Sequence, residues 1–254
     1  MLTESELHRY HEDGFVVPNY RLSNSTIEAI QASHGRLLDS YPQFADYCPT
    51  LLSYDTSFLD YARDDGILDM VAQIIGPHIA LWNSSFFAKP AKVGSRTPWH
   101  QDGEYWPIRP LATCSVWIAV DNSNIENGCL QVIPGSHKHR ELKNHHVNRA
   151  DGLALPLELD EDTFNERESV NIELERGQIS LHDVYLMHAS EPNRSNHPRR
   201  GMTLRFMPTT SVYRRDIEME MGGSALAQQR SLFLMRGRDV SGENDFRVRT
   251  LATS

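Results

Sequence analysis

The hydrophobic residues of this chain change their spacing at residue 79, and this change constrains the fold more than any other feature. From there on they come in short β-branched or aromatic runs, separated by clusters of Gly, Pro, Asn and Asp that are typical of the turns between strands. Many short strands after a helical start predict a mainly β fold, a jelly roll backed by N-terminal helices. The expected strands are Ile79–Phe87, Cys114–Val120, Cys129–Ile133, Val170–Leu174, Gln178–Leu181 and Thr203–Met207.

The first third of the chain is predicted to be helical. Thr3 followed by Glu6 forms a capping-box pattern, which opens a helix that we expect to end at Gly14. Ser23 precedes a second run in which apolar residues recur at helical spacing. A third helix is expected over Asp65–Ile75, where a Gly-Pro dipeptide closes it.

The length of 254 residues, with no linker or repeat, predicts a single domain over residues 1–254. We expect a helical preface over about 1–78, a jelly-roll core over about 79–210 and a C-terminal segment over about 211–254. The composition, with 39% hydrophobic and 23% charged residues, is that of an ordinary globular protein.

The net charge of -9 disfavours partners that need a basic face. Nucleic acids and anionic membranes bind clustered Lys and Arg, so we expect neither as a partner and a small-molecule substrate instead. No apolar stretch approaches the length that spans a bilayer. The three cysteines (Cys48, Cys114 and Cys129) form no metal-binding pair, and we expect buried, reduced thiols and a cytoplasmic location.

The segment Trp99–Gly103 is the strongest local indication of a functional site. Alternate residues of a strand share a face, so His100 and Asp102 would offer one metal an imidazole nitrogen and a carboxylate oxygen. A second imidazole must come from another strand, and His188, at the end of an apolar run, is the best candidate. Two histidines and one carboxylate leave three positions open, as a non-haem Fe(II) oxygenase needs. A His-x-Asp triplet alone also arises by chance, so the surrounding residues must decide.

Other histidines offer rival metal sites. The pairs His137 with His139 and His145 with His146 lie in a polar segment rich in Lys and Arg. Positive charge disfavours a bound cation, so we expect these histidines to be solvated. His182 lies close to His188 in sequence but has no second element to complete a site, and we expect it to have a supporting role.

The motifs, taken in order, resemble the phytanoyl-CoA dioxygenase family of Fe(II)/2-oxoglutarate-dependent oxygenases. Their number and order make the resemblance specific. It implies a double-stranded β-helix, the jelly-roll fold that is also called cupin-like. The matching segments are Lys89-Pro90, Trp99-His100-Gln101-Asp102, Tyr105-Trp106-Pro107, Trp117-Ile118-Ala119-Val120-Asp121, Asn127-Gly128-Cys129-Leu130, Pro134-Gly135-Ser136-His137, and His188-Ala189-Ser190-Glu191-Pro192-Asn193 through Ser195 to Arg199-Arg200.

The resemblance implies roles for individual residues. His100, Asp102 and His188 match the iron ligands and so form the expected catalytic centre. Arg199 matches the arginine that holds the distal carboxylate of 2-oxoglutarate, a contact suited to a planar guanidinium. Arg200 is the adjacent alternative, because strand alternation should point only one of the two inward.

Three more residues are expected to bind the cofactors. Gln101 and Trp117 match positions that line the pocket of iron and 2-oxoglutarate, and Lys89 belongs to the first of the matching motifs. For Trp117, plain packing in the core is an equally good interpretation, because apolar residues flank it.

The implied enzyme is a dioxygenase that uses Fe(II), 2-oxoglutarate and O2 to oxidise a C–H bond of a small or medium-sized metabolite, with release of succinate and CO2. Asp102 occupies the ligand position that halogenases leave to chloride, so we expect a hydroxylase. Two other functions stay open. A cupin-like metal enzyme without 2-oxoglutarate would not need Arg199, and a metal-bound jelly-roll binding module would have lost a ligand or the arginine.

The substrate is indicated only by charges. Glu104 would favour an amine if it continues the alternation of the metal motif into the pocket mouth, together with Trp106; otherwise it pairs with Arg109 at the surface. An anionic substrate would instead use cations such as Lys89, Lys92, Arg96, Arg109 and Arg140. We expect the polar segment from His137 to Glu168 to be a long surface loop that acts either as a mobile lid or as a plain insertion.

Overall fold

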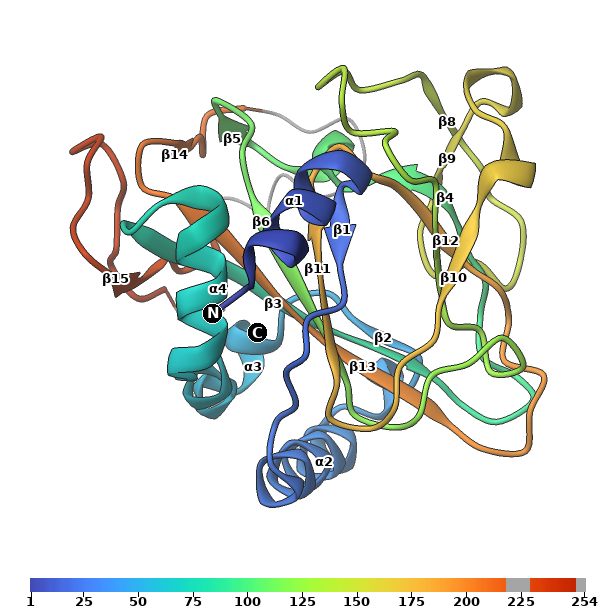
Figure 1. Cartoon of the computed structure of the whole chain (residues 1–254). Coiled ribbons are helices and arrows are strands. Elements are labelled where there is room, and N and C mark those ends of the chain that lie inside the picture. Colours follow the sequence, from blue (N-terminus) through green and yellow to red (C-terminus); the bar gives the residue numbers. More distant parts are fainter. Residues whose placement is uncertain (218–228, 250–254) are drawn as a thin grey trace.

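The computed structural model describes residues 1–217 and 229–249, and its centre is a pair of antiparallel β-sheets that face each other (Figure 1). The larger sheet has seven strands in the order β1-β11-β6-β13-β3-β15, with β2 also paired to β3. The smaller sheet has four strands in the order β10-β7-β12-β4. The prediction of a mainly β jelly roll, or double-stranded β-helix, is confirmed.

The elements have the following bounds. The larger sheet consists of β1 (Phe15–Val16), β2 (Tyr47–Cys48), β3 (Ile79–Lys89), β6 (Cys114–Ala119), β11 (Ile179–Asp183), β13 (Arg199–Pro208) and β15 (Phe233–Arg236). The smaller sheet consists of β4 (Thr97–Gln101), β7 (Leu130–Val132), β10 (Val170–Ile172) and β12 (Met187–Ser190). Two further sheets of two strands each pair β5 (Ile108–Arg109) with β14 (Val212–Tyr213), and β8 (His145–Val147) with β9 (Leu157–Leu159). The α-helices are α1 (Glu4–Asp13), α2 (Asn24–Ser40), α3 (Leu51–Tyr54) and α4 (Asp65–Ile75).

The helix starts and stops follow the expected local chemistry. Thr3 caps α1 by accepting a hydrogen bond from the backbone N–H of Glu6, whose side chain in turn accepts from the backbone of Thr3. Gly14 ends α1 in the left-handed region at a φ of 82°, where a side chain would be strained. The side chain of Ser23 caps α2 by accepting from the backbone N–H of Thr26, and that of Asp64 caps α4 by accepting from the backbone N–H of Ile67.

The helices cover the outer face of the larger sheet (Figure 1). Apolar residues of α2 and α4, such as Ile27, Ile30 and Val71, join one buried cluster with Phe86 on β3 and Phe206 on β13. A shared core supports the prediction that the helical preface and the jelly roll form one domain. Of the expected C-terminal segment, residues 218–228 and 250–254 lie outside the described residues.

The inner face of the larger sheet is left for the site. Successive residues of a strand face opposite sides, so Val116 and Ile118 of β6 contact the helices, whereas Trp117 faces the smaller sheet. The same alternation on β13 sends Met202 and Leu204 outward, toward the helices. The space between the sheets therefore receives side chains from both.

The segment 137–168 is more ordered than the predicted surface loop. It contains β8, β9 and two single-turn helices, and it is bonded to the elements beside the metal motif. The hydroxyl of Tyr105 accepts from the N–H of Leu157 at 3.1 Å and donates to its carbonyl at 3.3 Å. Arg96 forms an ion pair with Glu158 at 2.8 Å. These contacts fix the segment over β4 in the present conformation.

Two predictions made from composition concern the environment of the chain. Cys48, Cys114 and Cys129 are buried and free, as expected. Within residues 1–217 and 229–249, no helix is both long and apolar enough to cross a bilayer.

Candidate metal centre

The two histidines of the predicted triad lie side by side in the smaller sheet. His188 of β12 is the direct partner of His100 on β4, and their rings are 4.1 Å apart between centroids. Each ring uses Nδ1 to donate to a backbone carbonyl, His100 to Pro98 at 2.8 Å and His188 to Leu186 at 2.9 Å. A carbonyl can only accept, so Nδ1 carries the proton and Nε2 keeps a free lone pair. Such bonds orient histidines that bind metals.

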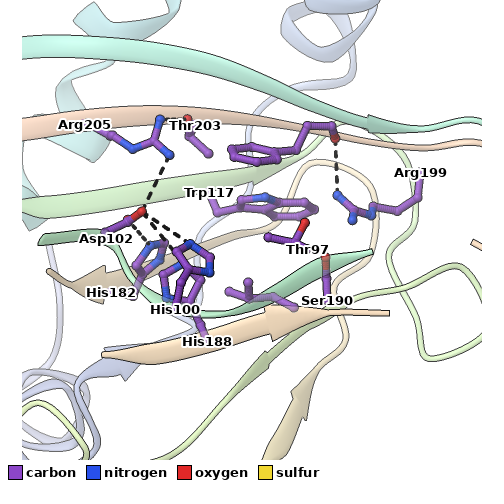
Figure 2. A pocket seen from close by; sticks show the side chains of 12 residues that line it. Thr97, His100, Asp102, Trp117, His182, His188, Ser190, Arg199, Thr203 and Arg205 are labelled. Atoms are coloured by element: carbon purple, nitrogen blue, oxygen red, sulfur yellow. Dashed lines mark hydrogen bonds and ion pairs between the residues drawn. The ribbon is translucent and has the colours of Figure 1, made fainter. Parts of the chain in front are cut away.

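Asp102 brings a carboxylate to the same place. It follows β4 directly and begins the 3₁₀ helix η3 (Asp102–Tyr105), so its oxygen Oδ1 lies 3.7 Å from Nε2 of His100 and 4.0 Å from Nε2 of His188 (Figure 2). One ligand atom from each of the three buried residues lies within 4.8 Å of the other two. The second oxygen, Oδ2, is buried without a hydrogen-bond partner. A buried acceptor left unpaired is expected where a ligand belongs.

The charge states suit a divalent cation. Burial alone would raise the pKa of Asp102, but the guanidinium of Arg205 and the nearby imidazoles together hold it well below its usual range. Burial, together with the neighbouring His100, lowers the pKa of His188 well below its usual value. A carboxylate and imidazoles with free lone pairs are the forms that bind metal. The donor set, two nitrogens and one oxygen, fits Fe(II) with positions left open for other ligands.

A pocket extends from this triad between the two sheets (Figure 2). The empty space among its side chains, including solvent at its mouth, is about 450 Å³. It is lined by Phe87, Thr97, His100, Asp102, Trp117, Leu130, His182, His188, Ser190, Arg199, Thr203 and Arg205.

Arg199 lies at the end of the pocket away from the triad (Figure 2). Its buried guanidinium donates to the carbonyls of Gly128 at 2.9 Å and Phe87 at 3.3 Å, while Nε has no partner. Burial lowers its pKa to about 10, so the group still carries its charge at neutral pH. A buried cation that pairs with no carboxylate among the described residues is suited to an anionic ligand.

Comparison with known proteins agrees with this geometry. The model of the phytanoyl-CoA dioxygenase family matches residues 10–201. The chain belongs to this family. Fe(II) and 2-oxoglutarate are the cofactors of the family, and the triad and Arg199 fit them.

The chain is similar in sequence to curated proteins from several organisms. A phytanoyl-CoA dioxygenase domain-containing protein 1 homolog of Dictyostelium discoideum is 30% identical over 59% of this chain and 54% of its own. The peroxisomal phytanoyl-CoA dioxygenase of Homo sapiens is 28% identical over 74% of this chain and 62% of its own. The chain thus spans less than two thirds of the length of these curated relatives. Among solved structures, the non-haem monooxygenase ThoJ in its apo form is 25% identical with a TM-score of 0.75, over 96% of this chain and 88% of its own.

The neighbouring Arg200 faces the other way, as alternation on β13 requires. It forms a two-pronged ion pair with Asp121, in which Nε and Nη2 lie 2.7 Å and 2.8 Å from the two carboxylate oxygens. Because this pair satisfies the guanidinium outside the pocket, Arg199 is the better candidate for the 2-oxoglutarate contact expected in the family.

Trp117 forms one wall of the pocket. Its ring lies 5.4 Å from Cζ of Arg199, within the range of a cation–π contact. The opposite side of the indole rests on Gly201 of β13, where a Cβ atom would come within 2.0 Å of the ring. Glycine at this position therefore makes room for the tryptophan, and Trp117 serves both the core and the pocket.

Gln101 and Lys89, the other two residues expected to bind cofactors, do not line the pocket among the described residues. The amide of Gln101 donates to the carbonyls of Glu141 and Tyr185 and accepts from the N–H of Lys143. The ammonium of Lys89 donates to three backbone carbonyls. These contacts favour structural roles for both side chains, next to the site and not inside it.

The rival histidines form no second centre. In the part of the chain that the structure describes, no other group of three His, Cys, Asp or Glu side chains comes together as a metal site. The expectation that His137 is solvated is wrong, because it is 8% exposed beneath Gly14 and bonds to the carbonyl of His11. His145 is half-buried and accepts from the N–H of Gln101. His182 also lines the pocket, with Nε2 3.6 Å from Oδ2 of Asp102, and its supporting role stays a prediction.

Four polar residues of the pocket were not predicted: Thr97, Ser190, Thr203 and Arg205. Strand alternation was the available signal for three of them. Ser190 is two residues beyond His188 on β12, and Thr203 and Arg205 follow Arg199 at even spacing on β13. The expected strand, Thr203–Met207, is shorter than β13 and leaves out Arg199, so it does not show that Arg199, Thr203 and Arg205 share one face.

Proposed function

We propose that this protein is an Fe(II)- and 2-oxoglutarate-dependent oxygenase that hydroxylates a C–H bond of a small or medium-sized metabolite and releases succinate and CO2. The observation that carries the proposal is a buried pocket with two histidines and a carboxylate at one end and an unpaired guanidinium at the other. A divalent metal and a dicarboxylate are the pair of ligands that such a pocket complements.

The chain's own residues would position the reactants. His100, Asp102 and His188 would hold the metal from one face, because all three direct a free lone pair to one point. Arg199 would bind the distal carboxylate of 2-oxoglutarate through donors that the fold leaves free. Fe(II) with 2-oxoglutarate supplies, when bound, the activation of O2. The apolar walls of the pocket exclude bulk water and so protect the reaction from competing proton and electron transfer.

We also propose a reaction type and a location in the cell. Because Asp102 is present and buried beside His100 and His188, hydroxylation is favoured over halogenation, which needs that position free. A cupin-like enzyme without 2-oxoglutarate would have no use for a buried, unpaired Arg199, and neither would a metal-bound jelly-roll module that only binds. We also propose a cytoplasmic location, which the buried free cysteines support.

The test measures metal binding and the uncoupled consumption of 2-oxoglutarate. Protein prepared without oxygen should bind about one Fe(II) per chain, and exposure to O2 with 2-oxoglutarate should yield succinate, detected by mass spectrometry. His188→Ala should reduce both to background with the fold intact by circular dichroism. The matched control is His139→Ala, an exposed histidine that should change neither. A folded His188→Ala variant that makes succinate at the wild-type rate would contradict the ligand set.

A further inference from the structure

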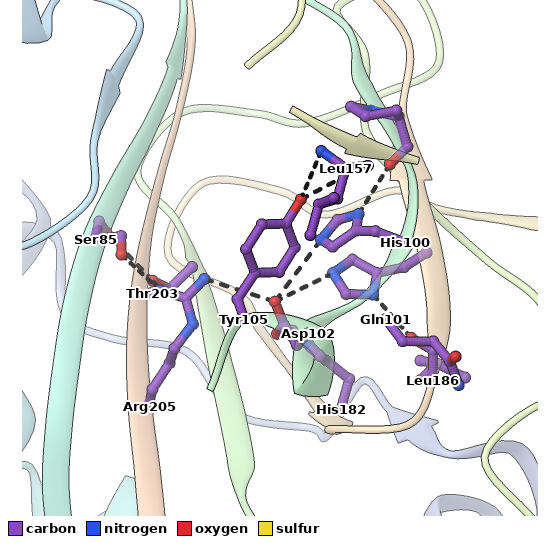
Figure 3. A network of polar contacts seen from close by, with 12 residues as sticks. Ser85, His100, Gln101, Asp102, Tyr105, Leu157, His182, Leu186, Thr203 and Arg205 are labelled. Atoms are coloured by element: carbon purple, nitrogen blue, oxygen red, sulfur yellow. Dashed lines mark hydrogen bonds and ion pairs between the residues drawn. The ribbon is translucent and has the colours of Figure 1, made fainter. Parts of the chain in front are cut away.

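The pocket contains a second arginine, Arg205, which is neither a metal ligand nor the proposed partner of the distal carboxylate of 2-oxoglutarate. It lies on β13 with 6% exposure, and its guanidinium is held in place on one side (Figure 3). There Nη1 donates to Oγ of Ser85 at 2.5 Å and to Oγ1 of Thr203 at 3.0 Å. Because two hydroxyls fix the group, its direction is determined by the fold and not by a ligand.

The other side of this guanidinium points to the triad and is not fully bonded. Nη2 lies 4.0 Å from Oδ1 of Asp102, too far for a hydrogen bond, and Nε has no partner although it is buried. The rings of Phe87 and Trp106 flank the group, with their centroids 5.8 Å and 5.2 Å from Cζ. Free donors between two aromatic walls form a compact site for an oxyanion.

In the described pocket Asp102 is the nearest acid to Arg205, but once Fe(II) and 2-oxoglutarate are bound the charge of Arg205 has no counter-ion left. Two positive charges of a bound Fe(II) and that of Arg199 would be balanced by Asp102 and the two carboxylates of 2-oxoglutarate. Among the pocket-lining residues that the structure describes, Asp102 is the one acid, so the charge of Arg205 is left over. An uncompensated buried cation is costly, which favours a further anion in the loaded pocket.

We propose that Arg205 binds an anionic group of the substrate, a carboxylate or a phosphate-type oxyanion, and thereby sets the position of the C–H bond that is oxidised. The inference rests on the proposed function, since it assumes that the metal and 2-oxoglutarate fill the rest of the pocket. It names a substrate class and a specificity-determining residue.

The position of Arg205 also restricts the substrate. Its Nη2 and the metal-facing oxygen of Asp102 are 4.0 Å apart, so an anion on Arg205 lies close to the metal position. The oxidised carbon is therefore only a few bonds from the anionic group.

An amine substrate, the alternative based on Glu104, is not favoured. The 3₁₀ helix at Asp102–Tyr105 ends the strand alternation, and Glu104 is not among the lining residues. Two guanidinium groups would also repel an amine.

The experiment uses small anions as probes on the full chain, loaded with Fe(II) and saturating 2-oxoglutarate in the absence of oxygen. With 2-oxoglutarate bound, Arg199 is occupied and cannot capture the probe. Acetate and methylphosphonate are titrated separately as anionic probes, and ethylammonium is titrated as the cationic probe. Binding is followed by the visible absorbance of the metal complex and by tryptophan fluorescence. The wild type should bind at least one of the two anions and not ethylammonium, and the preferred anion distinguishes a carboxylate from a phosphonate substrate.

The variants Arg205→Gln and Arg205→Lys decide the outcome. Arg205→Gln should weaken binding of the preferred anion at least tenfold, because it removes the charge, whereas Arg205→Lys should retain part of the affinity. Anion binding is compared with Fe(II) and 2-oxoglutarate at saturation in each variant, because the loss of the Arg205 charge also changes the surroundings of Asp102. Equal anion binding by Arg205→Gln would overturn the proposal. Loss of Fe(II) binding in both variants would also overturn it, since Arg205 would then serve only as counter-ion of Asp102.

The failure of this inference differs from that of the proposed function. If the wild type binds neither 2-oxoglutarate nor metal, the proposed function is wrong. If both bind and succinate forms, but no anion binds at Arg205, only the present inference is wrong. A metabolite panel matched for size then gives the second readout, because succinate formation should be stimulated by anionic members in the wild type and not in Arg205→Gln.

Discussion

Arg199 and Arg200 are adjacent in sequence but differ in every physical respect that matters for binding. Arg200 is satisfied by both oxygens of Asp121 outside the pocket, and this partner raises its pKa. Arg199 is fully buried and bonds only to carbonyls, which leaves its charge without a partner among the described residues. The difference follows from the side of β13 on which each residue lies.

Exchanging each arginine for glutamine tests this assignment. Arg199→Gln should raise the KM for 2-oxoglutarate roughly 30-fold or more, since removing one partner of a buried charge-assisted contact costs at least about 2 kcal/mol. Arg200→Gln should leave this KM unchanged and lower stability modestly, because Asp121 loses its ion pair. Steady-state succinate formation gives the first quantity and thermal unfolding the second. The reverse pattern would mean that Arg200 holds the co-substrate.

At the scale of elements, Lys89 joins β3 to two other segments. It ends β3, and its Nζ donates to the carbonyls of Ser95 at 2.5 Å, Glu191 at 2.7 Å and Ser190 at 3.3 Å. The side chain of Asn193 donates in turn to the carbonyl of Lys89 at 2.8 Å. The end of β12, which carries His188, is thereby tied to the larger sheet.

Lys89→Met should therefore destabilise the fold more than it affects binding. Three buried or partly buried carbonyls would lose their donor, at a cost of about 2–3 kcal/mol, or roughly 5–10 °C in Tm for a chain of this size. Lys92→Met, at an exposed lysine nearby, should leave the Tm unchanged. Calorimetry measures the effect. An unchanged Tm together with a raised KM for 2-oxoglutarate would show that Lys89 binds the cofactor, as the family resemblance implied.

The elements also show what the sequence can predict. Long strands with apolar residues on both faces, such as β3 and β6, were predicted to within two residues, because burial on both sides leaves an unbroken apolar run. The four-residue β12 was not predicted, although His188, which lies on it, was named as a candidate ligand. Segment 137–168 was expected to be a loop because its sequence is mostly polar, and contacts with distant residues such as Tyr105, Gln101 and Arg96 reveal its packing. Such long-range contacts leave no local pattern.

For the whole molecule, the site lies between two sheets that contribute different parts of it. His100 and His188 belong to the smaller sheet, whereas Arg199 and Arg205 belong to β13 of the larger one. The two sheets are therefore joined by the ligand site as well as by the apolar contacts between them. A metal bound at one side and 2-oxoglutarate that reaches to the other would link them, and the stability of the whole chain should depend on both ligands.

This linkage gives a prediction for thermal unfolding. At a hundred times its Kd, a ligand that binds only the folded state stabilises it by about 2.7 kcal/mol, which corresponds to roughly 5–10 °C in a chain of this length. Mn(II) with 2-oxoglutarate, a pair that avoids oxidation, should raise the Tm by more than Mn(II) alone. Arg199→Gln should keep the increment from Mn(II) and lose most of that from 2-oxoglutarate, whereas His188→Ala should lose both, because 2-oxoglutarate is expected to bind through the metal as well as the arginine. If 2-oxoglutarate stabilises the His188→Ala variant as strongly as the wild type, it binds independently of the metal, and the two halves of the pocket do not form one site.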